Sequence, residues 1–139
     1  MSALFTPIQL RDVTLPNRIV ISPMCQYSSV DGCATSWHTV HLGSLALSGA
    51  GMLCLEATAI EADGRISPYD LGLYNDATEA ALKSVLEVVR THSKIPITVQ
   101  LAHAGRKASS NRPWEGGQII ALEDGGWITS APSALRFKE

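Results

Sequence analysis

Apolar residues along the chain gather in short runs of strand length. Residues 4–22 hold small apolar pieces separated by turn-type residues, which predicts a hairpin. Residues 19–21 are a continuous β-branched run that stops before Pro23, which is typical of a strand buried on both faces. Residues 52–57 and 97–101 are two further runs that predict strands.

Two segments between these runs have helical spacing instead. Residues 37–48 predict a helix with Ser36 as its N-cap. Its expected apolar face contains Trp37, Val40, His41 and Leu45. Residues 77–93 predict a second helix, which starts with an acidic capping box of Asp76 and Glu79. Its apolar stripe is Leu82, Val85, Leu86 and Val89.

The order of these elements predicts an α/β fold. Strands and helices alternate after the hairpin, which favours a parallel sheet with right-handed crossovers. Long loops follow the strands, whereas the connections from helix to strand are short. Both (β/α)8 barrels and doubly wound sheets place ligands at the carboxyl ends of the strands, and three strands do not decide between them.

Composition and charge exclude several classes of protein. The 139 residues carry 11 Lys and Arg against 13 Asp and Glu, so there is no basic surface for nucleic acid. No apolar run approaches the ~20 residues of a membrane span, and the start is unlike a secretory signal, so we expect a cytoplasmic protein. The cysteines Cys25, Cys33 and Cys54 are odd in number and form no CxxC pair, which argues against a disulfide framework and a metal site.

Two further patterns do not support a cofactor or metal site. The glycines Gly49 and Gly51 precede a predicted strand, whereas a dinucleotide fingerprint follows one. His38 and His41 are spaced i, i+3 on the first helix, but no acidic residue or cysteine nearby completes a ligand set. Core or surface histidines are the favoured interpretation of this pair.

Motifs at the ends of the three predicted strands resemble the Old Yellow Enzyme family. They are SPMCQY at 22–27, AT at 57–58 and QLAHAGRK at 100–107, joined by WH at 37–38 and NRPWEG at 111–116. The likeness covers essentially the whole chain. It is greatest to the thermophilic-like branch, which includes the xenobiotic reductases.

The resemblance implies an FMN-dependent NAD(P)H oxidoreductase, an ene-reductase that reduces C=C bonds conjugated to a carbonyl or nitro group. It also implies a (β/α)8 TIM barrel. Residues 1–139 would then be an incomplete N-terminal portion of that barrel, with the hairpin and about the first three β/α units. FMN would carry the redox chemistry, with NAD(P)H as reductant and an activated alkene as substrate.

The resemblance also assigns cofactor contacts after the first strand. Backbone groups of Ser22, Pro23 and Met24 would meet the flavin edge. Cys25 would lie beside the reactive part of the ring, where a polarizable thiol can tune its potential. The alternative for Cys25 is a buried structural cysteine.

Further roles follow for four other positions. Tyr27 would direct its hydroxyl to the activating oxygen of the substrate, although a half-buried loop tyrosine is the alternative. The Gln100 carboxamide suits the mixed donors and acceptors of the flavin pyrimidine ring. Ala57 would supply a backbone contact. Arg106 and Lys107 would either add charge near the site or be solvated.

The family's substrate-binding histidine pair, proton-donating tyrosine and phosphate site all follow later in the barrel. We therefore expect the chain to belong to a larger polypeptide and to bind flavin weakly alone. The alternative is a non-catalytic fragment or assembly element whose open strand edges pair with a complementary C-terminal half, or in a homo-oligomer. A small flavodoxin-like domain explains the alternation but not the motifs.

Overall fold

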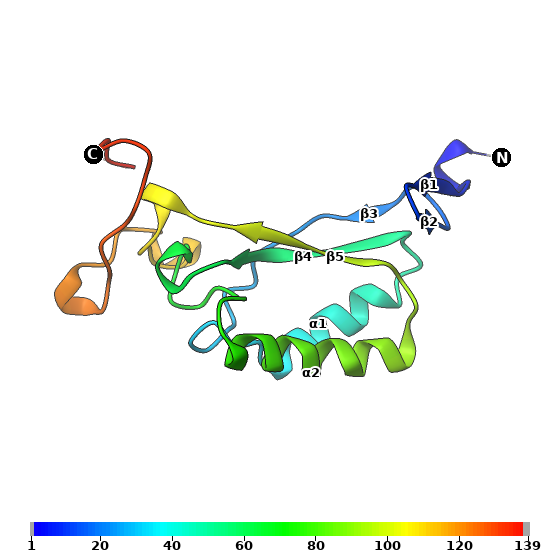
Figure 1. Ribbon diagram of the computed structural model, residues 1–139, viewed down its shortest axis with the longest axis horizontal. Helices are drawn as coiled ribbons and strands as arrows, with labels where there is room; N and C mark the ends of the chain where they lie inside the picture. The colour runs from blue at the N-terminus through cyan, green and yellow to red at the C-terminus, as the bar shows by residue number, and fades with distance from the viewer. Residues whose placement is uncertain (1, 138–139) are drawn as a thin grey trace.

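The computed structural model describes residues 2–137. Its strands and longer helices are β1 (Ile8–Leu10), β2 (Val13–Leu15), β3 (Val20–Ile21), α1 (Ser36–Ala46), β4 (Met52–Ala59), α2 (Asp76–His92) and β5 (Ile97–Ala102). Short 3-10 turns make up the helical structure after β5. The hairpin and the C-terminal segment lie at opposite ends of the molecule (Figure 1).

The strands form two separate sheets. β1 and β2 pair antiparallel, with Ile8 opposite Leu15, which confirms the predicted hairpin. β3, β4 and β5 form a parallel sheet in that order, with Val20 opposite Met52. This sheet confirms the predicted alternation of strands and helices. Within residues 2–137 the sheet is open, since it has three strands and no closure into a barrel.

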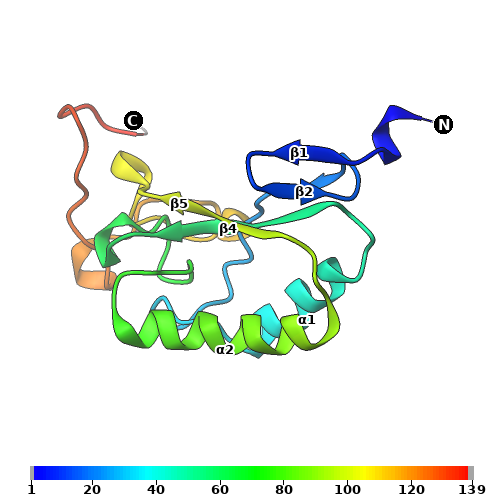
Figure 2. The same cartoon turned by 45° about the vertical axis from the view of Figure 1, so that its right-hand side comes forward.

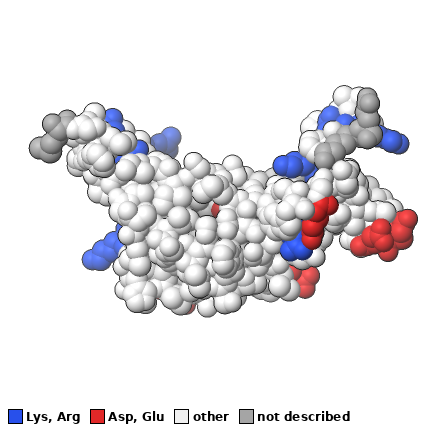
Figure 3. Space-filling model, turned by 180° about the vertical axis from the view of Figure 1, so that it is seen from behind, with Lys and Arg blue, Asp and Glu red and all other residues white. Residues whose placement is uncertain are grey.

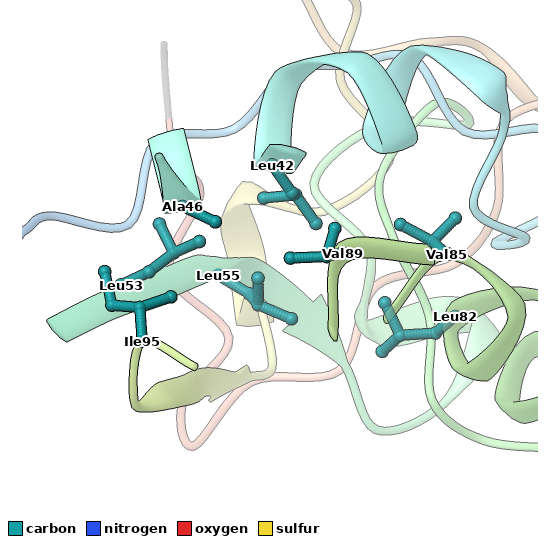
Figure 4. Packing of buried hydrophobic residues seen from close by; sticks show 8 residues of the cluster. All are labelled: Leu42, Ala46, Leu53, Leu55, Leu82, Val85, Val89 and Ile95. Carbon is teal, nitrogen blue, oxygen red and sulfur yellow. The ribbon is translucent and has the colours of Figure 1, made fainter. Parts of the chain in front are cut away.

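The hydrophobic core lies between the parallel sheet and the two helices. α1 and α2 cover the same face of the sheet (Figure 2). Leu53 and Leu55 of β4 are at most 2% exposed and point toward this layer. Figure 4 shows them meeting residues of α1, α2 and the connection to β5. Those residues are Leu42, Ala46, Leu82, Val85, Val89 and Ile95.

The first helix, α1, begins with a different N-cap residue from the one predicted, and it buries a different face. Its N-cap is Thr35, and Ser36 is its first residue. The buried residues are His38, Leu42 and Ala46, spaced i, i+4 and i+8. The predicted face is wrong because apolar residues occur all round this helix, so spacing alone does not select one side. Of that face, Trp37 and Val40 are exposed and His41 and Leu45 are half-buried.

The second helix matches its prediction more closely. Leu82, Val85 and Val89 are buried as expected, and Leu86 is partly buried against them. The cap lies one residue earlier than predicted, because Asn75 accepts the Thr78 N–H at 2.9 Å and Thr78 Oγ1 accepts the Asn75 N–H at 3.2 Å. Among residues 2–137 no helix has the length and apolar character needed to cross a membrane.

The first parallel strand is shorter and more exposed than predicted. β3 has only two residues, and Val20 is 45% exposed. Burial on both faces is therefore wrong for this run. β3 is an edge strand that pairs with β4 alone, and the two long helices lie on one face of the sheet.

Candidate functional site

The residues predicted for the site lie near the carboxyl ends of three adjacent strands. β3 ends at Ile21, so Ser22 and the residues up to Tyr27 follow it as a loop, which we call the strand-tip loop (residues 22–27). Ala57 of β4 is the register partner of Gln100 of β5. Because the three strands are parallel, these positions meet at one edge of the sheet.

A β-bulge in β4 lies beside this edge. Leu55 pairs with Val99 and Ala57 pairs with Gln100, so Glu56 is the extra residue of β4. A bulge re-aims the side chains around it. The Glu56 carboxylate accepts the Gln26 N–H at 2.9 Å and thereby links β4 to the strand-tip loop.

Cys25 lies directly against β4. The Ala57 backbone hydrogen-bonds its sulfur. Burial, followed by the negative charges of Asp70 and Glu56, raises the pKa of Cys25 to about 11, while Lys107 opposes the rise. Cys25 is therefore a neutral thiol at physiological pH.

Tyr27 has an unusual backbone conformation at the end of the strand-tip loop. Its φ of 50° is in the left-handed region, which non-glycine residues rarely adopt. Its ring meets Trp114 edge to face, with ring centres 5.4 Å apart. Burial first, and then Cys25, Asp70 and Glu56, raise the pKa of Tyr27, so its hydroxyl keeps its proton near neutral pH.

A cavity of about 390 Å³ adjoins the ends of β4 and β5. Ala57, Gln100, His103 and Lys107 are among its lining residues. Its volume is within the range of small-molecule sites. The Gln100 side chain is exposed, and within residues 2–137 no group hydrogen-bonds its carboxamide.

The remaining predicted residues do not line the cavity at the ends of β4 and β5. Ser22 and Met24 are exposed, Pro23 is half-buried, and the Met24 carbonyl accepts a hydrogen bond from Gln26 Nε2 at 2.9 Å. Tyr27 lines a second cavity of about 280 Å³. Ile66 and Lys107 line both cavities and so connect Tyr27 with the Gln100 side of the site.

Sequence reasoning missed two acidic residues of the site. Glu56 is a charged residue inside an otherwise apolar strand, and that exception in the pattern is a signal that could have identified it. Asp70 is buried, and its carboxylate accepts the Ile66 N–H at 2.6 Å and the Ser67 N–H at 3.1 Å. Asp70 lies in a loop without periodicity, so nothing in the sequence distinguished it.

Comparisons with known proteins agree on one family. The sequence model of the NADH:flavin oxidoreductase / NADH oxidase family matches residues 3–125. An NADPH dehydrogenase of Listeria welshimeri is 52% identical over all of this chain and 37% of its own length. An NADH:flavin oxidoreductase of Gibberella zeae is 46% identical over 94% of this chain and 32% of its own length.

Solved structures agree in fold. Morphinone reductase superposes with a TM-score of 0.71 and 30% identity, over 97% of this chain and 40% of that one. The old yellow enzyme of Trypanosoma cruzi has a TM-score of 0.77 at 22% identity, over 99% of this chain and 36% of that one, and shows the fold alone. The chain spans about a third of the length of the curated relatives that it matches. The family match confirms the resemblance seen in the motifs, and the chain belongs to the NADH:flavin oxidoreductase / NADH oxidase family.

Proposed function

We propose that the chain acts in an FMN-dependent NAD(P)H oxidoreductase that reduces activated C=C bonds of unsaturated carbonyl or nitro compounds. Family membership implies FMN as cofactor and NAD(P)H as reductant. In this proposal residues 1–139 form the hairpin and first three β/α units of a (β/α)8 barrel. They supply the part of the site that meets one edge of the flavin.

The observation that carries the proposal is the convergence of three groups at one sheet edge. Cys25 is hydrogen-bonded by the Ala57 backbone, and Ala57 pairs with Gln100. The Gln100 carboxamide offers both donors and an acceptor to the cavity, and the small Ala57 side chain permits close approach. These groups fit the edge of a planar heterocycle that has mixed donors and acceptors.

Each residue has a binding or orienting task in this proposal. Ser22, Pro23 and Met24 bring backbone groups to the ring edge, and Gln100 hydrogen-bonds the pyrimidine end. Cys25 presents a neutral thiol to the ring, and the Tyr27 hydroxyl donates a hydrogen bond to the activating oxygen of the substrate. The chemistry that FMN supplies when bound is hydride transfer.

Two matched substitutions test the cofactor contact. Gln100→Ala removes the free carboxamide, whereas Gln118→Ala removes an exposed glutamine from another cavity. We expect Gln100→Ala to weaken FMN binding roughly tenfold in a fluorescence titration, since the hydrogen bonds proposed between its carboxamide and the bound ring are lost. Equal affinities in the two variants would contradict the assignment of Gln100.

A chimera tests the activity. This chain would replace the matching 37% of the Listeria welshimeri NADPH dehydrogenase, to which it is 52% identical. We expect the chimera to bind FMN and to reduce 2-cyclohexenone with NADPH. Tyr27→Phe should then lower kcat/KM roughly tenfold by removing one hydrogen bond to the substrate oxygen. A chimera that folds and binds FMN but leaves the enone unreduced would defeat the ene-reductase proposal.

A second candidate is an assembly element that is active only with a complementary half. It is favoured by a groove of about 880 Å³ between α2 and β5, lined by apolar residues such as Leu82, Leu86 and Ile97. Mixing the chain with a separately produced remainder of the same relative tests this candidate. Restored FMN binding on mixing would support it, and two components that stay apart in size-exclusion chromatography would not.

A further inference from the structure

Glu56 is a buried carboxylate at the centre of the site's supporting structure. Its side chain is 3% exposed, and it occupies the bulge of β4. A buried carboxylate is costly unless it is paired and hydrogen-bonded. Its Oε2 accepts the Gln26 N–H at 2.9 Å, and its Oε1 lies 3.5 Å from His38 Nε2.

The orientation of His38 is set from its other side. Nδ1 accepts the Thr35 backbone N–H at 2.9 Å, so Nδ1 carries no proton. The ring proton is therefore on Nε2, on the side of Glu56. His38 is fully buried and lies in the first turn of α1. Because the Glu56 carboxylate contacts both His38 and Gln26, it connects the start of α1 and the strand-tip loop to the bulge of β4.

Both the backbone and the side chain of Gln26 hold the strand-tip loop in place. Gln26 N–H donates to Glu56, and Gln26 Oε1 accepts from Trp37 Nε1 at 3.2 Å. Gln26 lies between Cys25 and Tyr27. A left-handed conformation such as that of Tyr27 persists only where surrounding contacts hold it.

We propose that Glu56 is a positioning residue: through the Gln26 N–H it fixes Cys25 and Tyr27 over the ends of β4 and β5, with His38 orienting the carboxylate from behind. That the positioning of Cys25 and Tyr27 serves the reaction rests on the proposed function. The charged or titratable groups that face Cys25 are Glu56, Asp70, Lys107 and Tyr27, so loss of the Glu56 charge also makes the Cys25 thiolate easier to form.

Alkylation of the three thiols tests the proposal without any cofactor. Iodoacetamide at pH 9.5, followed by mass spectrometry of peptides, gives a separate rate for each cysteine. Glu56→Ala should accelerate Cys25 roughly tenfold, because the loop is released and the thiolate fraction rises. Cys33 and Cys54 are not hydrogen-bonded to the Glu56 carboxylate and should keep their rates.

Two further variants separate charge from fold. Glu56→Gln removes the negative charge but keeps an oxygen that can accept the Gln26 N–H, so we expect a smaller, roughly threefold rise at Cys25. Glu61→Gln is the matched control. It also breaks a Glu–His pair, with His103 at 2.7 Å, but on an exposed side chain, and it should leave all three rates unchanged.

Hydrogen exchange gives the second readout. The peptide that contains Gln26 and Tyr27 should exchange roughly tenfold faster in Glu56→Ala, with the peptides of α2 unaffected. An unchanged Cys25 rate, or equal acceleration at all three thiols, would overturn the positioning role. If Glu56→Ala fails to fold, the same two criteria are applied to Glu56→Gln.

FMN titration of the unmodified chain and of the chimera keeps the two proposals apart. Absence of FMN binding in both would defeat the proposed function. The contrast between Cys25 and the other thiols would still decide whether Glu56 positions the strand-tip loop.

Discussion

Cys25 is a thiol that its neighbours keep protonated. Burial contributes most to its raised pKa, and the carboxylates of Asp70 and Glu56 add to it. A neutral thiol is a weak donor and a polarizable contact, but a poor nucleophile. These properties suit a residue that touches a cofactor without forming a bond to it, which is the role we propose for Cys25.

Lys107 is the cation that opposes the rise in the pKa of Cys25. Lys107→Met should raise the pKa of Cys25 further, because a positive charge that favours the thiolate is lost. We expect its alkylation at pH 9.5 to slow about two- to threefold, as measured by mass spectrometry of peptides. Lys83→Met, on the exposed side of α2, is the control. A faster reaction at Cys25 in Lys107→Met would contradict the electrostatic account.

The raised pKa of Cys25 also predicts how stability depends on pH. The folded state binds this proton more tightly than the unfolded state, whose thiol has its usual value near 9.0. The stabilisation is therefore complete below about pH 9 and is lost as the pH rises toward 11. Urea unfolding at pH 8.5 and 10.5 should show that the wild type loses more stability than Cys25→Ser. Because the thiol is partly solvated, we expect a difference of about 1 kcal/mol. Parallel losses in the two proteins would refute the linkage.

The two helices show what hydrophobic spacing can and cannot predict. In α2 a single apolar stripe sits among charged residues, so pattern and packing agree. In α1 apolar residues surround the helix, and the buried side is selected by contact with β4 and by the pairing of His38 with Glu56. That pairing is non-local, and the sequence pattern does not contain it.

The same distinction applies to the site. Cys25, Ala57 and Gln100 could be expected to converge because the ends of parallel strands share one edge. The bulge at Glu56 could not, since it depends on the register between β4 and β5. Tyr27 likewise has a left-handed backbone and a ring contact with Trp114, a residue far along the chain, and local sequence contains neither feature. Strand ends were therefore predictable, whereas the contacts that orient the side chains were not.

The face of α1 can be tested with one pair of substitutions. Leu42 is 4% exposed in the core, whereas Val40 is 66% exposed. Leu42→Ala should lower the free energy of unfolding by about 2–4 kcal/mol, because it removes buried methyl groups and leaves a cavity. Val40→Ala should change it by less than about 0.5 kcal/mol. Urea unfolding of both variants checks this, and a larger effect at Val40 would restore the face predicted from spacing.

At the scale of the whole molecule, helices cover the two faces of the parallel sheet unequally. Two helices cover one face of the parallel sheet (Figure 2). The view from behind shows charged side chains mainly toward the two ends and a largely uncharged middle (Figure 3). Within residues 2–137 the outer edge of β5 has no partner strand, and Leu101 on it is 60% exposed. An open edge with exposed apolar side chains is a surface for association.

We therefore expect the 139-residue chain alone to associate reversibly at micromolar concentration through β5. Leu101→Lys should weaken this association roughly tenfold, because a charged side chain on an edge strand opposes pairing with another strand. Leu122→Lys is the matched control, since Leu122 is 62% exposed and lies outside the sheet. Sedimentation velocity over a concentration series measures both variants. If the wild type remains monomeric throughout, or if both lysines act equally, the edge of β5 is not the surface that associates.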